Sequence, residues 1–132
     1  MTSYFLDTSV IIDYLRGKEN IVDLLDNLDG ELTSSYFCLA ELFEGVYRSK
    51  NKEKTKEIII HFFSGLHGTY GVDPEIAEKF GQLRKDLKTK GAIIEDIDLF
   101  IAATCLINNL TLVTLNKKHF ARVKGIKLLD IY

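Results

Sequence analysis

The stretch SYFLDTSVIIDYLRG, residues 3–17, joins a short apolar run to an acid and then to a helical repeat. Residues 4–6 are predicted to form a buried strand that ends at Asp7. Apolar residues then recur at helical spacing until Gly17 stops the predicted helix: Val10, Ile11, Tyr14 and Leu15. A buried strand that leads directly into an amphipathic helix is typical of the start of an α/β domain.

The rest of the chain repeats this alternation of short strands and longer helices. Strands are predicted at residues 31–33, 69–72, 112–114 and 126–129, with helices between them. Asp73 and Pro74 have the residue types of a helix N-cap and first helical position. This order favours a three-layer α/β/α domain around a central, mostly parallel sheet. No linker or repeat interrupts residues 1–132, so one domain is predicted.

Composition limits the class of protein. The chain is 46% hydrophobic, but no apolar run approaches the roughly 20 residues of a membrane span, so no membrane association is expected. The start, MTSYFLDTS, lacks the basic region of a signal peptide, which predicts a cytoplasmic protein. Cys38 and Cys105 lie in apolar patterns and are predicted as buried free thiols rather than a disulfide.

Charge is distributed unevenly along the chain. The net charge is only −2, yet residues 93–110 contain three acids and no lysine or arginine. Residues 111–132 contain five basic residues and one acid. This distribution fits an acidic centre flanked by basic surface, and ordinary solvated helix faces would also produce it.

Five positions are candidates for a functional site, and each also has a structural interpretation. An acid after a strand, such as Asp7, often only caps the next helix, and Glu41 fits an exposed helix face. Asp96 resembles an N-cap, Asp98 would then lie in the first turn, and Asn116 could stabilise a turn.

The joint interpretation is stronger than any single one. In a parallel sheet, Asp7 and the residues after Thr114 emerge at the same edge, where α/β proteins bind ligands. Two carboxylates ~4 Å apart repel by about 4 kcal/mol at an effective dielectric near 20, so they must be protonated, spread apart or neutralised by a cation. Oxygen ligands without His or Cys select Mg²⁺ or Mn²⁺, and such sites perform metal-assisted hydrolysis or phosphoryl transfer.

Five segments, in order along the chain, resemble the PIN-domain ribonucleases, and more narrowly the VapC-type toxins of VapBC toxin–antitoxin pairs. They are LDTSVIIDYLRG, LAELFEGVYRSKN, IEDIDLFIAAT, LVTLNKKHF and GIKLLDIY. The resemblance implies a PIN fold with an acidic pocket that holds Mg²⁺ or Mn²⁺. By position it implies Asp7 and Asp98 as metal ligands, and Glu41 as a residue that acts through the metal or its water. Asn116 takes a fourth place that is often aspartate in the family, and Asp96 is a secondary candidate.

The resemblance also implies an activity and partners. The activity is endonucleolytic hydrolysis of RNA, possibly tRNA, by an activated water that leaves a 5′-phosphate and a 3′-hydroxyl. The partners are an antitoxin that covers the acidic groove and a second copy of the chain. Thr8 and Thr114 match positions where hydroxyls lie near the acids. Five basic residues are candidates for guiding the RNA backbone, although each also fits a solvated surface: Lys50, Lys52, Lys117, Lys118 and Arg122.

Two other functions fit the sequence less well. A haloacid dehalogenase-type phosphatase needs a second Asp two residues after the first, where this chain has Ser9. A receiver domain needs an acidic pair after strand one and a lysine after a late strand, and both are missing. A non-catalytic PIN fold that binds RNA or protein remains the alternative. The three histidines have no evident partner and are predicted to be structural or at the surface: His61, His67 and His119.

Overall fold

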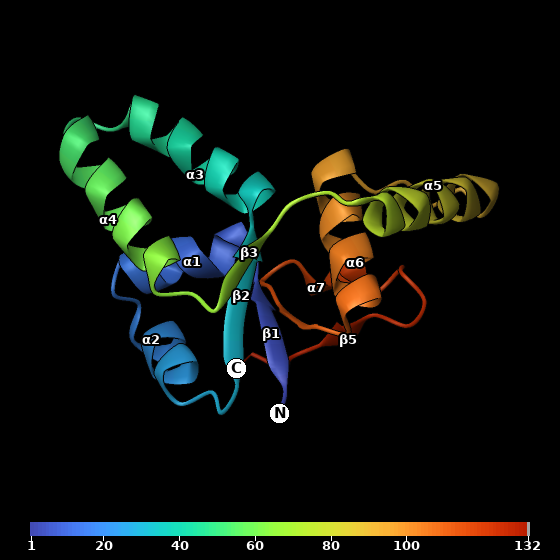
Figure 1. Cartoon of the computed structure of the whole chain (residues 1–132), viewed down its shortest axis with the longest axis horizontal. Helices are drawn as coiled ribbons and strands as arrows, with labels where there is room; N and C mark the ends of the chain where they lie inside the picture. The colour runs from blue at the N-terminus through green and yellow to red at the C-terminus, as the bar shows by residue number, and fades with distance from the viewer. Residues whose placement is uncertain (132) are drawn as a thin grey trace.

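A five-stranded sheet forms the centre of the molecule in the computed structural model, which describes residues 1–131. Its strand order is β3-β2-β1-β4-β5, and all four strand pairs are parallel. Figure 1 labels the elements, which are β1 (Ser3–Leu6), α1 (Thr8–Leu15), α2 (Glu19–Asp26), β2 (Glu31–Ser35), α3 (Tyr36–Arg48), α4 (Lys52–Ser64), β3 (Gly68–Tyr70), α5 (Pro74–Thr89), α6 (Asp96–Asn108), β4 (Thr111–Val113), α7 (Lys117–Phe120) and β5 (Lys127–Leu128).

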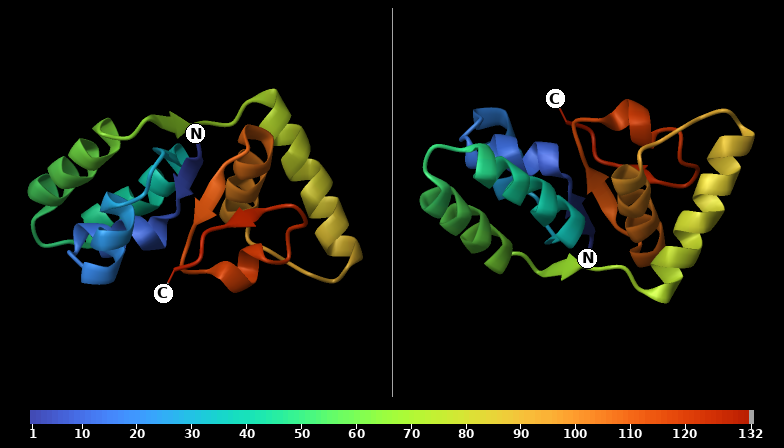
Figure 2. Two further views of the ribbon diagram at one scale, coloured as in Figure 1. Left: turned by 90° about the horizontal axis from the view of Figure 1, so that it is seen from below. Right: turned by 90° about the horizontal axis from the view of Figure 1, so that it is seen from above.

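Helices cover both faces of this sheet. Figures 1 and 2 show α1–α4 on one side and α5–α7 on the other, with the strands between the two groups. The predicted three-layer α/β/α architecture is therefore confirmed, and the sheet is parallel at every strand pair. β1 is the central strand, so whatever follows its carboxyl end lies in the middle of one sheet edge.

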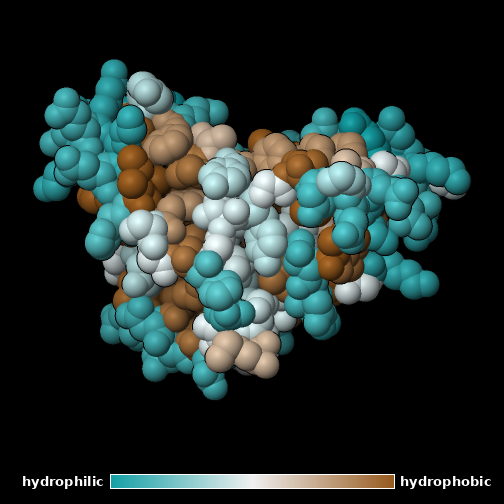
Figure 3. Space-filling model, in the orientation of Figure 1, coloured by the Kyte–Doolittle hydropathy of each residue, from teal (hydrophilic) through white to brown (hydrophobic). Residues whose placement is uncertain are grey.

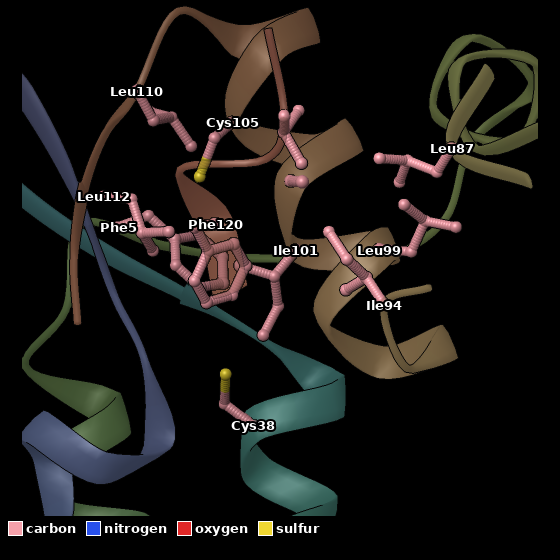
Figure 4. Packing of buried hydrophobic residues seen from close by; sticks show 12 residues of the cluster. Phe5, Cys38, Leu87, Ile94, Leu99, Ile101, Cys105, Leu110, Leu112 and Phe120 are labelled. Atoms are coloured by element: carbon pink, nitrogen blue, oxygen red, sulfur yellow. The ribbon is translucent and has the colours of Figure 1, made fainter. Parts of the chain in front are cut away.

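Two hydrophobic clusters follow from the alternation of side chains along β1. Phe5 belongs to the cluster under α5–α7, whereas Leu6 belongs to the cluster under α1–α4. Figure 4 shows the first cluster, in which Phe5 gathers with residues of β4, α6 and α7. Cys38 and Cys105 are both buried in this cluster as free thiols, as predicted.

Helix starts follow the predicted capping chemistry, with one exception. The Asp73 carboxylate accepts a hydrogen bond from the Ile76 N–H at 2.8 Å, and Pro74 is the first residue of α5, as predicted. The N-cap of α6 is Glu95, so the interpretation of Asp96 as an N-cap is wrong. Asp96 is instead the first helical residue, where its charge still favours the positive end of the helix dipole.

Strand boundaries differ from prediction by one or two residues. β2 runs to Ser35, two residues beyond its predicted end, and β3 begins and ends before the predicted residues 69–72. Pairing with a neighbouring strand decides where each strand begins and ends. The apolar run of a single segment does not reveal that pairing. Within residues 1–131, no helix is both long and apolar enough to cross a membrane.

Gly30, just before β2, is the glycine at which a side chain would collide most severely with its surroundings. A Cβ atom there would overlap the backbone carbonyl oxygen of Thr2 and lie 2.9 Å from Cε2 of Tyr4. We expect Gly30→Ala to lower the free energy of unfolding by about 1–3 kcal/mol, as overpacking does. A Cβ atom at Gly81 in α5 would meet nothing within 4 Å. Gly81→Ala should therefore raise the free energy of unfolding by about 0.5–1 kcal/mol. Urea unfolding measures the change in stability of both variants. Equal midpoints for the two variants would contradict the predicted collision at Gly30.

Candidate active site

Asp7 is buried at the carboxyl end of the central strand. Its backbone N–H donates to the Val113 carbonyl at 3.0 Å, which fixes the end of β1 against β4. The residue is only 4% exposed, and both carboxylate oxygens accept hydrogen bonds. The Thr8 N–H donates to Oδ1 at 2.8 Å, and the Thr114 hydroxyl donates to Oδ2 at 2.7 Å. Asp7 therefore caps α1 and is also held rigidly at the sheet edge.

Burial and neighbouring acids disfavour the charged form of Asp7. Loss of solvation raises the pKa of Asp7, the hydrogen bonds from Thr114 and Thr8 lower it, and the charge of Asp98 raises it. Partial burial also raises the pKa of Asp98, while the interaction with His119 lowers it and the charges of Glu41 and Glu95 raise it. These carboxylates are close enough to repel one another, so a bound cation would stabilise the site.

Thr8 connects two of the candidate acids. While its N–H donates to Asp7, its hydroxyl donates to Oε1 of Glu41 at 2.7 Å. This bond ties the middle of α3 to the start of α1 across 33 residues of sequence. The structure therefore brings Asp7, Glu41 and Asp98 to one edge of the sheet, at the starts of α1 and α6 and the adjacent face of α3.

Asn116 lies beside this group on the loop after β4. Its N–H donates to the Thr114 hydroxyl at 3.0 Å, and that hydroxyl in turn donates to Asp7. The Asn116 side chain is exposed and makes no capping hydrogen bond to α7. Its amide is thus available at the same edge as the acids.

Asp96 is directed elsewhere. Its Oδ1 forms a 3.0 Å ion pair with Nη1 of Arg84 on α5, and its side chain is 60% exposed. The Asp98 side chain is 20% exposed. Two residues along an α-helix rotate a side chain by about 200°, so only one of these two acids faces the site.

His119 is a surface residue, as predicted, but sequence reasoning missed its contact with Asp98. Its Nδ1 lies 3.7 Å from Oδ2 of Asp98, so the expectation that it lacks a partner is wrong. His67 is a surface residue, as predicted, although its Nε2 lies 2.9 Å from Oε2 of Glu31. Glu95, which acts on Asp98 through its charge, was also not singled out. No sequence spacing signals the pairing of His119 with Asp98, because it depends on how α7 packs beside α6.

Comparisons with known proteins identify the family of this chain. The sequence pattern of the PIN domain matches residues 4–126. The chain belongs to the PIN-domain family. A relative within it, ribonuclease VapC1 of Methanocaldococcus jannaschii, is 36% identical over 127 residues, which are 95% of this chain and 85% of that protein. The tRNA(fMet)-specific endonuclease VapC of Shigella flexneri is 30% identical and covers 98% of both chains.

Solved structures place this PIN domain among the same proteins. The crystal structure of VapBC2 from Rickettsia felis, bound to a DNA fragment from its promoter, contains a chain that superposes with a TM-score of 0.88. That chain is 30% identical, and the match covers 99% of this chain and 100% of the other. A VapBC structure from Salmonella typhimurium matches with a TM-score of 0.87 at 30% identity, over 98% of both chains.

The hydroxyl of Thr114 offers a test of how this PIN domain positions Asp7. Thr114→Val keeps the shape of the side chain but removes the donor to the buried Oδ2, which should raise the pKa of Asp7 further. We expect the free energy of unfolding to fall by about 1–3 kcal/mol at pH 7. We also expect slower cleavage of RNA. Thr104→Val is the matched control, because that buried hydroxyl donates only to a carbonyl within its own helix. Equal effects of the two substitutions on activity would contradict a role in the site.

Proposed function

We propose that this chain is a metal-dependent endoribonuclease and acts as the toxin of a toxin–antitoxin pair. The observation that supports this most directly is the buried Asp7 carboxylate, fixed by Thr8 and Thr114 beside Asp98 and Glu41. Relatives named as VapC ribonucleases match over almost the whole chain, which supports the same activity.

Mg²⁺ or Mn²⁺ is the cation that suits these side chains. Within residues 1–131, no three Asp, Glu, His or Cys side chains lie close enough to hold a metal by themselves. Mg²⁺ does not require such a cage, because it keeps several waters and binds through one or two carboxylates and substrate phosphates. In this proposal Asp7 and Asp98 would hold the ion, and Glu41 would act through the ion or its water.

The cation supplies a water of lowered pKa and offsets negative charge on the phosphodiester. The chain's own residues position the reaction. Thr8 and Thr114 hold Asp7 and Glu41 in place, and the Asn116 amide orients the attacking water or a phosphate oxygen without adding charge.

Basic residues near α7 are proposed to bind the RNA backbone. A groove beside the acids is lined by Asn116, Lys118 and His119. Lys117 also lines this groove, but its Nζ is paired with Asp130 at 3.0 Å. The Arg122 guanidinium is likewise engaged, because it donates to the Ile93 carbonyl at 2.9 Å. Lys118 is therefore the strongest of the basic candidates, whereas Lys50 and Lys52 lie at the turn between α3 and α4.

The substrate and partners follow from the relatives as proposals. The Shigella flexneri relative is named for tRNA(fMet), which favours a tRNA as the substrate of this chain. The VapBC structures favour a VapB-type antitoxin as a partner of this chain. We further propose that the antitoxin covers the acidic groove and that two copies of this chain form a homodimer through their early helices. We place the protein in the cytoplasm, where its RNA substrate would be.

Cleavage by the purified chain tests this function. We expect it to cut total tRNA with Mg²⁺ or Mn²⁺, to stop in EDTA, and to leave products with 5′-phosphate and 3′-hydroxyl ends. End-labelled fragments before and after phosphatase treatment identify those ends. If no RNA is cut with either ion and titration calorimetry detects no ion binding, a non-catalytic binding module would be the better account.

A further inference from the structure

Three phenylalanine rings form a parallel stack beside the acidic site. The ring centroids of Phe37 and Phe100 are 4.9 Å apart at an interplanar angle of 13°, and those of Phe80 and Phe100 are 4.0 Å apart at 16°. Within residues 1–131, Phe37 and Phe80 make no ring contact with each other, so they lie on opposite faces of Phe100. All three rings keep part of their surface exposed.

The two ends of this stack differ. The guanidinium of Arg84 lies over Phe80, 5.6 Å from the ring centroid, and also pairs with Asp96. That end is therefore occupied. Phe37 forms the other end, and within residues 1–131 no second ring covers its outer face.

The open end lies next to the acids. Phe37 and Glu41 are four residues apart on α3, so they share one helix face about one turn apart. Phe100 lies four residues after Asp96 on α6 and shares its face, so the stack reaches the acids through Phe37. Figure 3 shows hydrophobic, pale-brown side chains exposed at the top of α6, between α3 and α5. Phe37, partly exposed and one helical turn from Glu41, thus lies beside the place where a phosphodiester would be cut.

We propose that the outer face of Phe37 stacks against one unpaired base of the RNA, next to the phosphate that is cut. This inference rests on the proposed ribonuclease function and assigns to Phe37 a contact with one base of the substrate. Aromatic rings bind unstacked bases because every base has a π-face, whereas the bases of an A-form helix are already stacked on one another. The parallel rings and the Arg84 guanidinium give Phe37 a rigid support.

Binding measured by fluorescence anisotropy tests the contribution of the base. The probe is a fluorescein-labelled single-stranded oligoribonucleotide, in EDTA and low salt, compared with the same strand made abasic. We expect Phe37→Leu to weaken binding of the intact strand about 5- to 150-fold and to change binding of the abasic strand little. Lys118→Ala is the control, because losing a phosphate contact should weaken both strands equally and reduce the salt dependence.

Tryptophan fluorescence gives a second measurement that does not depend on a loss of binding. The chain contains no tryptophan, so Phe37→Trp introduces a single emitter at the proposed site. Intact RNA should quench this emission and abasic RNA should not. Tyr47→Trp, at a 70% exposed position later in α3, should respond to neither strand.

The outcomes separate this inference from the function on which it rests. If the native chain cuts RNA but Phe37→Leu binds both strands as the native chain does, or Phe37→Trp is quenched equally by both, stacking at Phe37 is wrong and the ribonuclease function stands. If the native chain neither cuts nor binds single-stranded RNA, both proposals are overturned.

Discussion

Asp7→Asn is expected to abolish RNA cleavage, with a fall in rate of at least about 100-fold. The substitution keeps the size of the side chain but removes the charge that is proposed to hold the cation, and such electrostatic contributions are worth several kcal/mol of transition-state stabilisation. Single-turnover cleavage of a labelled RNA measures the effect. Cleavage by Asp7→Asn within a few fold of the native rate would show that Asp7 is not part of the active site.

The same substitution is expected to stabilise the fold in the absence of divalent cations. The pKa of Asp7 is raised above its ordinary value of 3.8, so the folded chain binds this proton more tightly than the unfolded chain does. The free energy of unfolding therefore falls as pH rises from about 3.8 through the folded pKa, and Asn avoids this cost at pH 7. Urea unfolding in EDTA should show a higher midpoint for Asp7→Asn. A lower midpoint would mean that the hydrogen bonds from Thr114 and Thr8 to the charged carboxylate outweigh the cost of its burial, since Asn keeps the capping oxygen.

Phe120→Ala is expected to cause a large loss of stability. Phe120 is fully buried at the end of α7 and packs in the cluster between the sheet and α6. Truncating such a ring costs about 3–5 kcal/mol, a large share of the roughly 5–15 kcal/mol that stabilises a domain. Because α7 follows Asn116 directly, the loop at the site should also loosen.

Phe43→Ala is the control for this substitution. Phe43 is only partly buried at the edge of the other cluster, so its removal should lower the free energy of unfolding by less. Both variants are measured by urea unfolding. If the two losses were equal, Phe120 would not be the residue that anchors α7.

The sequence was sufficient to predict the fold and to place Asp7 at the carboxyl end of a buried strand. The apolar run ending at Asp7 predicted a buried strand with an acid at its carboxyl end, because side-chain burial and strand period leave a local pattern. The parallel arrangement then placed Asp7 and the loop containing Asn116 at one edge. These inferences needed only periodicity and topology.

The contacts that organise the site could not be predicted in this way. Thr114 bonds to Asp7 across 107 residues, and Thr8 to Glu41 across 33, and no local pattern records such pairings. The choice between Asp96 and Asp98 depended on the rotation of α6 and on the presence of Arg84 on α5. The contact of His119 with Asp98 likewise appears only once α7 is packed.

The most direct test of the central claim is single-turnover RNA cleavage by the native chain, Asp98→Asn and Asp86→Asn in the presence of Mn²⁺. Asp86 is an exposed acid on α5 and serves as the matched control. We predict that Asp98→Asn is at least about 100-fold slower than the native chain, as expected for loss of a metal ligand, while Asp86→Asn retains the native rate. Cleavage by Asp98→Asn at the native rate would contradict the assignment of this acidic edge as the active site.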